Sequence, residues 1–186
     1  EGERLICESG ATLAAIARVA LEQGLTGFEF AAGIPGSLGG AIVMNAGAYD
    51  GEMKQVVESV RLITSEGEIV TKSCEEMKFS YRHSILKEKP YLVLSVTIKL
   101  RKGEKEQIKA RMEELAQKRR EKQPLEYPSA GSTFKRPEGY FAAKLIQDAG
   151  LRGLMVGGAQ VSEKHCGFVI NKDQATAKDI YELMKR

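Results

Sequence analysis

A glycine-rich loop is the first candidate for chemistry in this chain. Residues 33–51 hold six glycines and contain neither Lys nor Arg. Glycine lets backbone N–H groups converge at positive φ with no side chain in the way, so such a loop can hold a phosphate or a flat cofactor without cationic side chains. We therefore expect a binding site in this loop.

The spacing of these glycines differs from that of both common phosphate-binding motifs. A P-loop needs Lys and then Ser or Thr after its last glycine, whereas Ala41 and Ile42 follow Gly40. The dinucleotide fingerprint needs G-x-G-x-x-G, whereas the spacing here is G-x-x-G-x-x-G-G. On glycine content alone, two tight turns around a buried strand over 41–45 are an equally good interpretation.

Two further segments carry unusual polar side chains. One covers residues 79–84 and includes Arg82, and the other covers residues 127–137 and includes Ser132. Taken alone, Arg82 is typical of a surface arginine in a polar loop, and His83 of a loop histidine. Ser132 on its own favours a turn beside Gly131.

The N-terminal two thirds of the chain show clear periodicity. The sequence predicts a strand over 4–7 and a helix over 13–21, with Ser9 or Thr12 as the N-cap and Gly24 after its end. Residues 59–64 and 69–71 flank a turn-like segment and predict a β-hairpin. Strict alternation predicts a strand over 91–100. One face of that strand should present Leu92, Leu94, Val96, Ile98 and Leu100.

A long helix is predicted over 104–122, because apolar residues recur at helical spacing until Pro124 disfavours helix in the residue before it. Its basic end, 118–122, is expected to be solvated. We expect a domain boundary near Gln123. Beyond it, the pattern predicts a helix over 141–149, short strands near 161 and over 168–170, and a last helix opened by a capping box at Thr176.

Composition limits the function classes. The 186 residues allow one or two domains, and a net charge of +3 from 28 basic and 25 acidic residues is too balanced for nucleic-acid binding by bulk electrostatics. No apolar run approaches the roughly 20 residues of a membrane span, so we expect a soluble cytoplasmic protein. Cys7, Cys74 and Cys166 are widely spaced, which favours reduced thiols over a disulfide framework or a metal site.

Together the polar segments resemble one family over essentially the whole chain. They read G-I-P-G-S-x-G-G-A-x-x-M-N-A-G-A-Y, then Y-R-x-S, then P-S-A-G-S-x-F-K-R-P, followed by Gly157-Gly158-Ala159 and Val169-Ile170-Asn171. In this order they are similar to the UDP-N-acetylenolpyruvoylglucosamine reductases of peptidoglycan synthesis, in the shorter form that lacks an extra substrate-covering insertion.

The resemblance implies an oxidoreductase reaction. Hydride would pass from NADPH to FAD, and then to the enolpyruvyl methylene of UDP-N-acetylglucosamine enolpyruvate, giving UDP-N-acetylmuramate. Ser132 matches the family's proton donor to the carbanion-like centre, and Arg82 matches the arginine that contacts the enolpyruvyl carboxylate. Lys135 and Arg136 would meet the substrate diphosphate, and Tyr127 and Asn171 would be further substrate contacts.

The same resemblance assigns the glycine loop to the flavin. Backbone amides and the side chains of Ser37, Asn45 and Tyr49 would line it. The full set of matched cofactor positions is Gly33, Ile34, Pro35, Gly36, Ser37, Gly39, Gly40, Ala41, Asn45, Gly47, Ala48 and Tyr49.

The implied fold class is α+β. Residues 1–122 resemble the second subdomain of an FAD-binding module of the vanillyl-alcohol-oxidase type, and residues 123–186 an incomplete substrate-binding domain, with the active site between them. The family's FAD pyrophosphate loop and a catalytic glutamate would lie beyond the two ends of this chain. We therefore expect poor FAD retention and little turnover from these 186 residues alone. The alternatives are a non-catalytic flavin- or sugar-nucleotide-binding fragment and another FAD-linked oxidoreductase.

Overall fold

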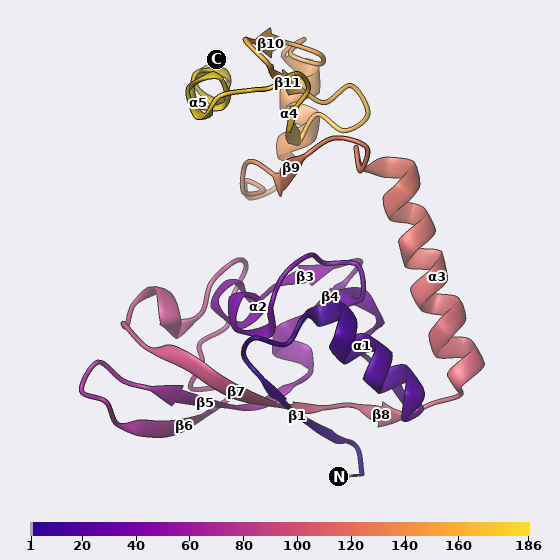
Figure 1. Cartoon of the computed structure of the whole chain (residues 1–186), viewed down its shortest axis with the longest axis vertical. Coiled ribbons are helices and arrows are strands. Elements are labelled where there is room, and N and C mark those ends of the chain that lie inside the picture. The colour runs from indigo at the N-terminus through magenta and orange to yellow at the C-terminus, as the bar shows by residue number, and fades with distance from the viewer. Residues whose placement is uncertain (1) are drawn as a thin grey trace. The chain divides into compact units, whose positions relative to one another are not determined.

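A computed structural model describes residues 2–186, and these divide into two compact units (Figure 1). Unit 1 ends at Ala116, and unit 2 is Gln117–Arg186. Each unit has an apolar core of its own. Helices and antiparallel strands occur in both, so the fold class is α+β, as the sequence predicts.

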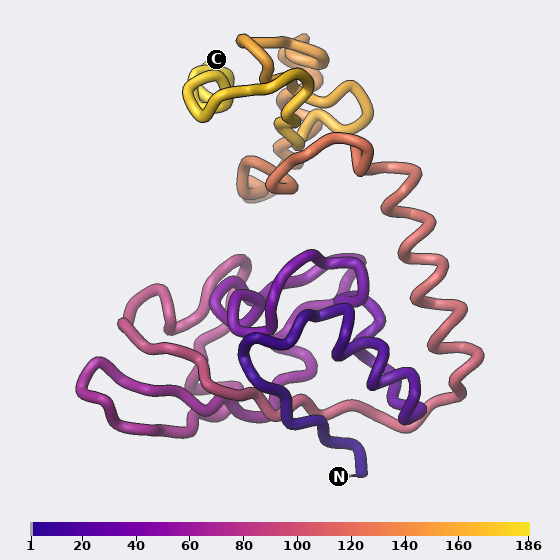
Figure 2. The backbone as a smooth tube through the Cα atoms, in the orientation of Figure 1, coloured from indigo at the N-terminus to yellow at the C-terminus, as the bar shows by residue number. Residues whose placement is uncertain are grey.

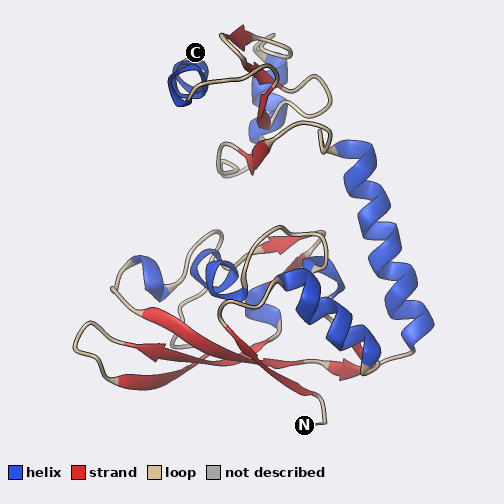
Figure 3. Ribbon diagram, viewed as in Figure 1, coloured by secondary structure: helices blue, strands red, loops and turns tan. Residues whose placement is uncertain are grey.

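Unit 1 is built on an antiparallel sheet with the strand order β1-β7-β5-β6. Its strands are β1 (Arg4–Glu8), β7 (Leu92–Lys99), β5 (Val57–Ile63) and β6 (Ile69–Ser73). The predicted strand over 4–7 and the predicted hairpin are thus confirmed. Helices α1 (Leu13–Glu22) and α2 (Leu38–Met44) lie on one face of this sheet (Figure 3). The apolar core is formed by side chains of the sheet and of these two helices.

The predicted alternation along β7 is interrupted by a bulge. Arg61 of β5 pairs with Ser95, but the next residue, Leu62, pairs with Val93, so β7 carries one extra residue here. Val93 therefore packs against the core. Leu92, which the alternation placed on the same face as Val96, is instead 69% exposed.

Helix α1 follows the predicted pattern closely. Leu13, Ile16, Ala17 and Ala20 are buried at helical spacing. Of the two predicted N-caps, Thr12 is the one used, because its side chain accepts a hydrogen bond from the Ala15 N–H at 3.2 Å. Gly24 takes a φ of +63° just after the helix end, as expected of a glycine there.

The glycine-rich segment folds as helix α2, so the interpretation of a buried strand over 41–45 is wrong. Leu38, Ala41 and Ile42 are buried, which is the i, i+3, i+4 spacing of one helix face. The Ser37 side chain caps the helix, and Asn45 ends it in the left-handed conformation at φ +41°. Packing of this face outweighs the low helix propensity of Gly39 and Gly40.

Short elements complete unit 1. Residues after α1 form β2 (Leu25–Thr26), which pairs with β8 (Arg101–Lys102), and those after α2 form β3 (Gly47–Ala48), which pairs with β4 (Gly51–Glu52). Three 3₁₀ turns span Glu29–Ala31, Met53–Gln55 and Ile85–Lys87.

Helix α3 (Lys105–Lys122) contains the boundary between the units, and the backbone enters it from β8 (Figure 2). Ile108 and Leu115 are buried, as the periodicity predicts. Arg119 is also buried, at 7% exposure, so the prediction of a solvated basic end is wrong at this residue. It lies at the helical spacing of the apolar stripe, where an arginine can bury its aliphatic stem.

Unit 2 holds a smaller antiparallel sheet with the order β10-β11-β12-β9. Its strands are β9 (Ser129–Ser132), β10 (Met155–Val156), β11 (Ala159–Val161) and β12 (Phe168–Asn171), and its own helices are α4 (Ala142–Asp148) and α5 (Ala177–Lys185). The predicted capping box opens α5, with Thr176 and Asp179 as its partners. None of the residues that the structure describes in α4 is buried.

Candidate active site

The glycine loop is held by its neighbours through backbone hydrogen bonds. The Leu13 N–H donates to the Gly36 carbonyl at 3.1 Å, and the Leu38 N–H donates to the Ala11 carbonyl at 2.8 Å. In contrast, the N–H groups of Gly36 and Ser37 have no acceptor within residues 2–186. The loop therefore offers two neighbouring backbone donors in a fixed position.

The glycines of this loop divide into two kinds. At Gly39 a Cβ would lie 3.2 Å from the Ser9 Cβ, and at Gly51 it would lie 2.4 Å from the Phe30 ring, so both are required by packing. At Gly36, φ is +152° and a Cβ would meet no atom of the described chain within 4 Å. Gly36 thus leaves open space above exposed backbone, which suits close approach of a flat group.

Arg82 lies in a tight turn between two paired residues. Ser80 and His83 exchange backbone hydrogen bonds of 3.2 and 3.1 Å, and Arg82 has a φ of +55°. Its Nη2 donates to the Gly47 carbonyl at 3.2 Å, and its guanidinium carbon lies 5.1 Å from the centre of the Tyr81 ring. The structure therefore brings Arg82 to the glycine-rich segment, 35 residues earlier in the chain.

Asn45, a predicted flavin contact, has its carboxamide engaged inside the protein. Its Nδ2 donates to the Glu52 Oε2 at 3.0 Å and to the Ser80 carbonyl at 3.1 Å, and its Oδ1 accepts from the Lys54 N–H at 2.9 Å. The residue is fully buried. These partners were not foreseeable from the sequence pattern, because they come from two separate segments.

Ser132 is the last residue of β9 and is exposed. It pairs with Phe168 of β12, and the next residue, Thr133, donates its N–H to the Gly167 carbonyl at 2.8 Å. Gly131, immediately before it, has a φ of +85°. Ser132 is therefore held in a strand rather than in the turn that the residues alone favoured, and its hydroxyl lies at the surface of unit 2.

Lys135 and Arg136 lie on the exposed segment that follows β9. The Arg136 guanidinium carbon is 5.4 Å from the centre of the Phe141 ring, at the start of α4. Two adjacent cations that remain accessible to solvent are suited to a diphosphate.

Tyr127 and Asn171 are connected through Lys172, a residue that the sequence analysis missed. The Lys172 ammonium donates to the Tyr127 hydroxyl and lies 4.1 Å from the centre of its ring. That hydrogen bond raises the pKa of Lys172. Asn171 also supports the neighbouring backbone, since its Oδ1 accepts from the Ala175 N–H at 2.8 Å. Lys172 gave no signal in the sequence because it lies 45 residues from Tyr127.

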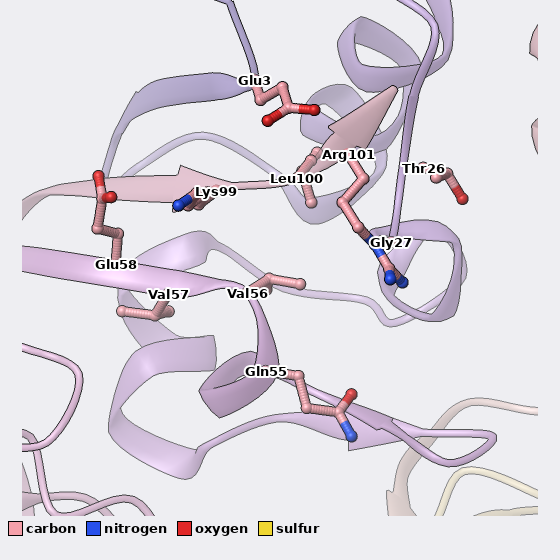
Figure 4. A pocket seen from close by; sticks show the side chains of 10 residues that line it. All are labelled: Glu3, Thr26, Gly27, Gln55, Val56, Val57, Glu58, Lys99, Leu100 and Arg101. Atoms are coloured by element: carbon pink, nitrogen blue, oxygen red, sulfur yellow. The ribbon is translucent and has the colours of Figure 1, made fainter. Parts of the chain in front are cut away.

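A pocket of about 830 Å³ lies elsewhere in unit 1 (Figure 4). It is bounded by the ends of β5 and β7 and mixes acidic with basic side chains. Its lining residues are Glu3, Thr26, Gly27, Gln55, Val56, Val57, Glu58, Lys99, Leu100 and Arg101. Within the described chain this lining includes none of the predicted site residues. The Arg4 guanidinium donates two hydrogen bonds to the carboxylate of Glu58, one of these lining residues, and this lowers the pKa of Glu58.

Comparisons with known proteins give matches at both ends of the chain. A family model described as an FAD binding domain matches residues 1–73, and one described as the UDP-N-acetylenolpyruvoylglucosamine reductase C-terminal domain matches residues 123–186. UDP-N-acetylenolpyruvoylglucosamine reductase of Caldanaerobacter subterraneus subsp. tengcongensis is 61% identical over 185 residues, which cover 100% of this chain and 61% of that protein. The chain belongs to the UDP-N-acetylenolpyruvoylglucosamine reductase family.

Other members of the reductase family give the same result. The protein of the same name from Clostridium novyi is 58% identical, covering 100% of this chain and 60% of its own length. The crystal structure of the reductase from Thermus caldophilus matches with a TM-score of 0.88 and 40% identity, over 96% of this chain and 65% of that one. The chain thus spans about three fifths of the length of the curated reductases that it matches.

Among residues 2–186, no helix combines the length and the apolar character needed to cross a bilayer.

Proposed function

We propose that this chain forms part of an NADPH-dependent flavoenzyme that reduces UDP-N-acetylglucosamine enolpyruvate to UDP-N-acetylmuramate. The observation that carries the proposal is the docking of Arg82 on the Gly47 carbonyl, which joins the Y-R-x-S turn to the glycine-rich segment. Membership of the reductase family supports it.

The glycine loop fits the ring side of a flavin. The free N–H groups of Gly36 and Ser37 can donate to ring carbonyl or nitrogen acceptors, and the open space at Gly36 admits a flat group. FAD, when bound there, supplies the hydride that it has received from NADPH. Around it, we propose that Gly33, Ile34 and Tyr49 complete the lining.

Arg82 would bind and orient the substrate. Its planar guanidinium can meet both oxygens of the enolpyruvyl carboxylate, and its positive charge stabilises the negative charge that develops there as hydride reaches the methylene carbon. Ser132 would then give its hydroxyl proton to the adjacent carbon, which completes the reduction of the double bond. Lys135 and Arg136 would hold the diphosphate, with Tyr127 as a further contact.

We propose that residues up to about 122 belong to the FAD-binding module and that residues from about 123 belong to a substrate-binding domain. We also propose that the protein is located in the cytoplasm. Cys7, Cys74 and Cys166 are free thiols, which is the form that a reducing compartment maintains.

The visible absorbance of bound flavin tests the proposed function. The purified chain is incubated with FAD, freed of unbound cofactor, and treated first with NADPH and then with the enolpyruvyl sugar nucleotide. Bleaching by NADPH followed by recovery on adding the sugar nucleotide is the result expected of a chain that retains flavin, and a chain with the full length of the relatives is expected to retain it better than these 186 residues. Bound flavin that the sugar nucleotide never reoxidises would point to another FAD-linked oxidoreductase. If no flavin is retained, a chain with the full length of the relatives is loaded in the same way, and failure there too would overturn the proposal.

A further inference from the structure

The turn that carries Arg82 needs support from outside itself. Arg82 occupies the third position of the four-residue turn 80–83 with a φ of +55°. This left-handed region suits glycine, and a residue with a Cβ is disfavoured there unless surrounding structure holds it. The two backbone hydrogen bonds between Ser80 and His83 close the turn but do not fix its position in the protein.

Two fully buried polar side chains supply the missing contacts. The Asn45 Nδ2 donates to the Ser80 carbonyl at 3.1 Å, at the start of the turn. The Ser84 Oγ donates to the Val43 carbonyl at 2.9 Å, directly after the turn. In one bond the glycine-rich segment is the donor, and in the other it is the acceptor. The two bonds therefore hold the turn at both of its ends.

Asn45 has no donor left for a ligand. Both hydrogens of its amide are used, by Ser80 and Glu52, and its oxygen accepts from Lys54. Its own left-handed backbone ends α2. The segment 43–47 therefore contacts the Arg82 turn at three points, which are the Val43 carbonyl, the Asn45 amide and the Gly47 carbonyl.

We infer that Asn45 and Ser84 are positioning residues, which hold the Arg82 turn against the end of α2 so that Arg82 keeps a fixed place beside the cofactor loop. The inference rests on the proposed function for the role of Arg82, and it replaces direct flavin contact as the task of the Asn45 side chain. A group that must meet a carboxylate with both nitrogens of a planar fork depends on such support, because a displacement of about 1 Å can cost about 10²-fold in rate.

Hydrogen exchange on the full chain tests the clamp without any turnover. Ser84→Ala removes one buried hydroxyl, and we expect exchange of the backbone amides in 77–85 to rise about tenfold. Ser80→Ala is the matched control, since it is the same substitution four residues earlier, at the start of the turn, and the Ser80 hydroxyl is exposed with no hydrogen bond in the described chain. Asn45→Asp keeps the acceptor for Lys54 but loses both donors, to Ser80 and to Glu52, so exchange over 77–85 should rise at least as much as in Ser84→Ala.

Exchange in the β5 and β7 peptides reports whether each variant keeps its fold. Unchanged exchange over 77–85 in both Ser84→Ala and Asn45→Asp, or an equal increase in Ser80→Ala, would overturn the clamp whatever the enzyme does. In the flavin-loaded enzyme, Ser84→Ala should raise KM for the enolpyruvyl sugar nucleotide about tenfold while flavin affinity stays the same. Loosened exchange with unchanged KM would overturn the positioning role of the clamp in substrate binding, and would leave the flavin test above to decide the proposed function.

Discussion

Replacing Ser132 distinguishes a catalytic function of the chain from a function in binding alone. The Ser132 hydroxyl is exposed at the end of β9, where it can reach a ligand, and it carries no charge that would anchor one. We expect Ser132→Ala to lower kcat by about 10² to 10⁴, because the substrate carbon that has gained negative charge then lacks its proposed proton donor. KM for the enolpyruvyl sugar nucleotide should stay nearly constant in steady-state kinetics of the flavin-loaded enzyme.

Ser129→Ala is the matched control for that experiment. Ser129 begins the same strand, is also exposed, and differs from Ser132 in that no role in the chemistry is proposed for it. Equal losses in the two variants would mean that the strand, not the hydroxyl of Ser132, carries the effect. An unchanged kcat in Ser132→Ala would show that another group delivers the proton.

The sequence reveals functional residue types more readily than their partners. The motif containing Ser132 and Lys135 is continuous in the chain, so a role for it can be proposed from neighbouring residues. The contact of Tyr127 with Lys172 joins residues 45 positions apart, so no local sequence pattern predicts it. Asn45 shows a subtler difference, because an amide in a cofactor loop suggests a ligand contact, whereas its buried carboxamide is hydrogen-bonded inside the protein.

The turn between β10 and β11 is packed closely against the segment that follows β12. A Cβ at Gly158 would lie 1.8 Å from the Asp173 carbonyl oxygen and 2.6 Å from the Ala175 N. The Gly158 carbonyl also accepts hydrogen bonds from the Lys172 and Asp173 N–H groups. We expect Gly158→Ala to destabilise unit 2 by about 1–3 kcal/mol or more, since both contacts are with backbone that cannot move aside easily.

The urea dependence of hydrogen exchange in unit 2 measures this effect. Gly10→Ala is the control, because a Cβ at Gly10 would meet no atom of residues 2–186 within 4 Å. Peptides of β11 and β12 should lose protection at lower urea in Gly158→Ala, while peptides of β5 keep theirs. An unchanged urea midpoint for β11 would contradict the packing argument.

Most elements could be predicted, and the failures have local causes. The spacing of Leu13, Ile16 and Ala17 fixes the buried face of α1 without reference to the rest of the chain. In α2, the glycine content favoured turns in the sequence analysis. The segment forms a helix instead, because a helix buries Leu38, Ala41 and Ile42 on one face. The bulge in β7 depends on how β5 pairs with it, so alternation along a single strand could not locate it.

The two units differ in how much apolar surface supports them, and this should govern how the whole molecule unfolds. The core of unit 1 gathers side chains from its sheet, α1 and α2. In the described part of unit 2 fewer apolar side chains are buried, namely those of Ala159, Val161, Cys166, Phe168, Ile170 and Leu183. Because burial of apolar area is the main stabilising contribution, we expect unit 2 to unfold first.

Hydrogen exchange at increasing urea concentrations follows both units in one experiment. Peptides of β11, β12 and α5 should lose protection at a lower urea concentration than peptides of β5 and β7. If the substrate contacts unit 2 as proposed, the enolpyruvyl sugar nucleotide at a hundredfold excess over its Kd should stabilise that unit by about 2.7 kcal/mol. The difference between the urea concentrations at which the two units lose protection should then become smaller. Loss of protection in both units at the same urea concentration without ligand would show that they unfold as one cooperative body, so that the small core of unit 2 does not limit its stability.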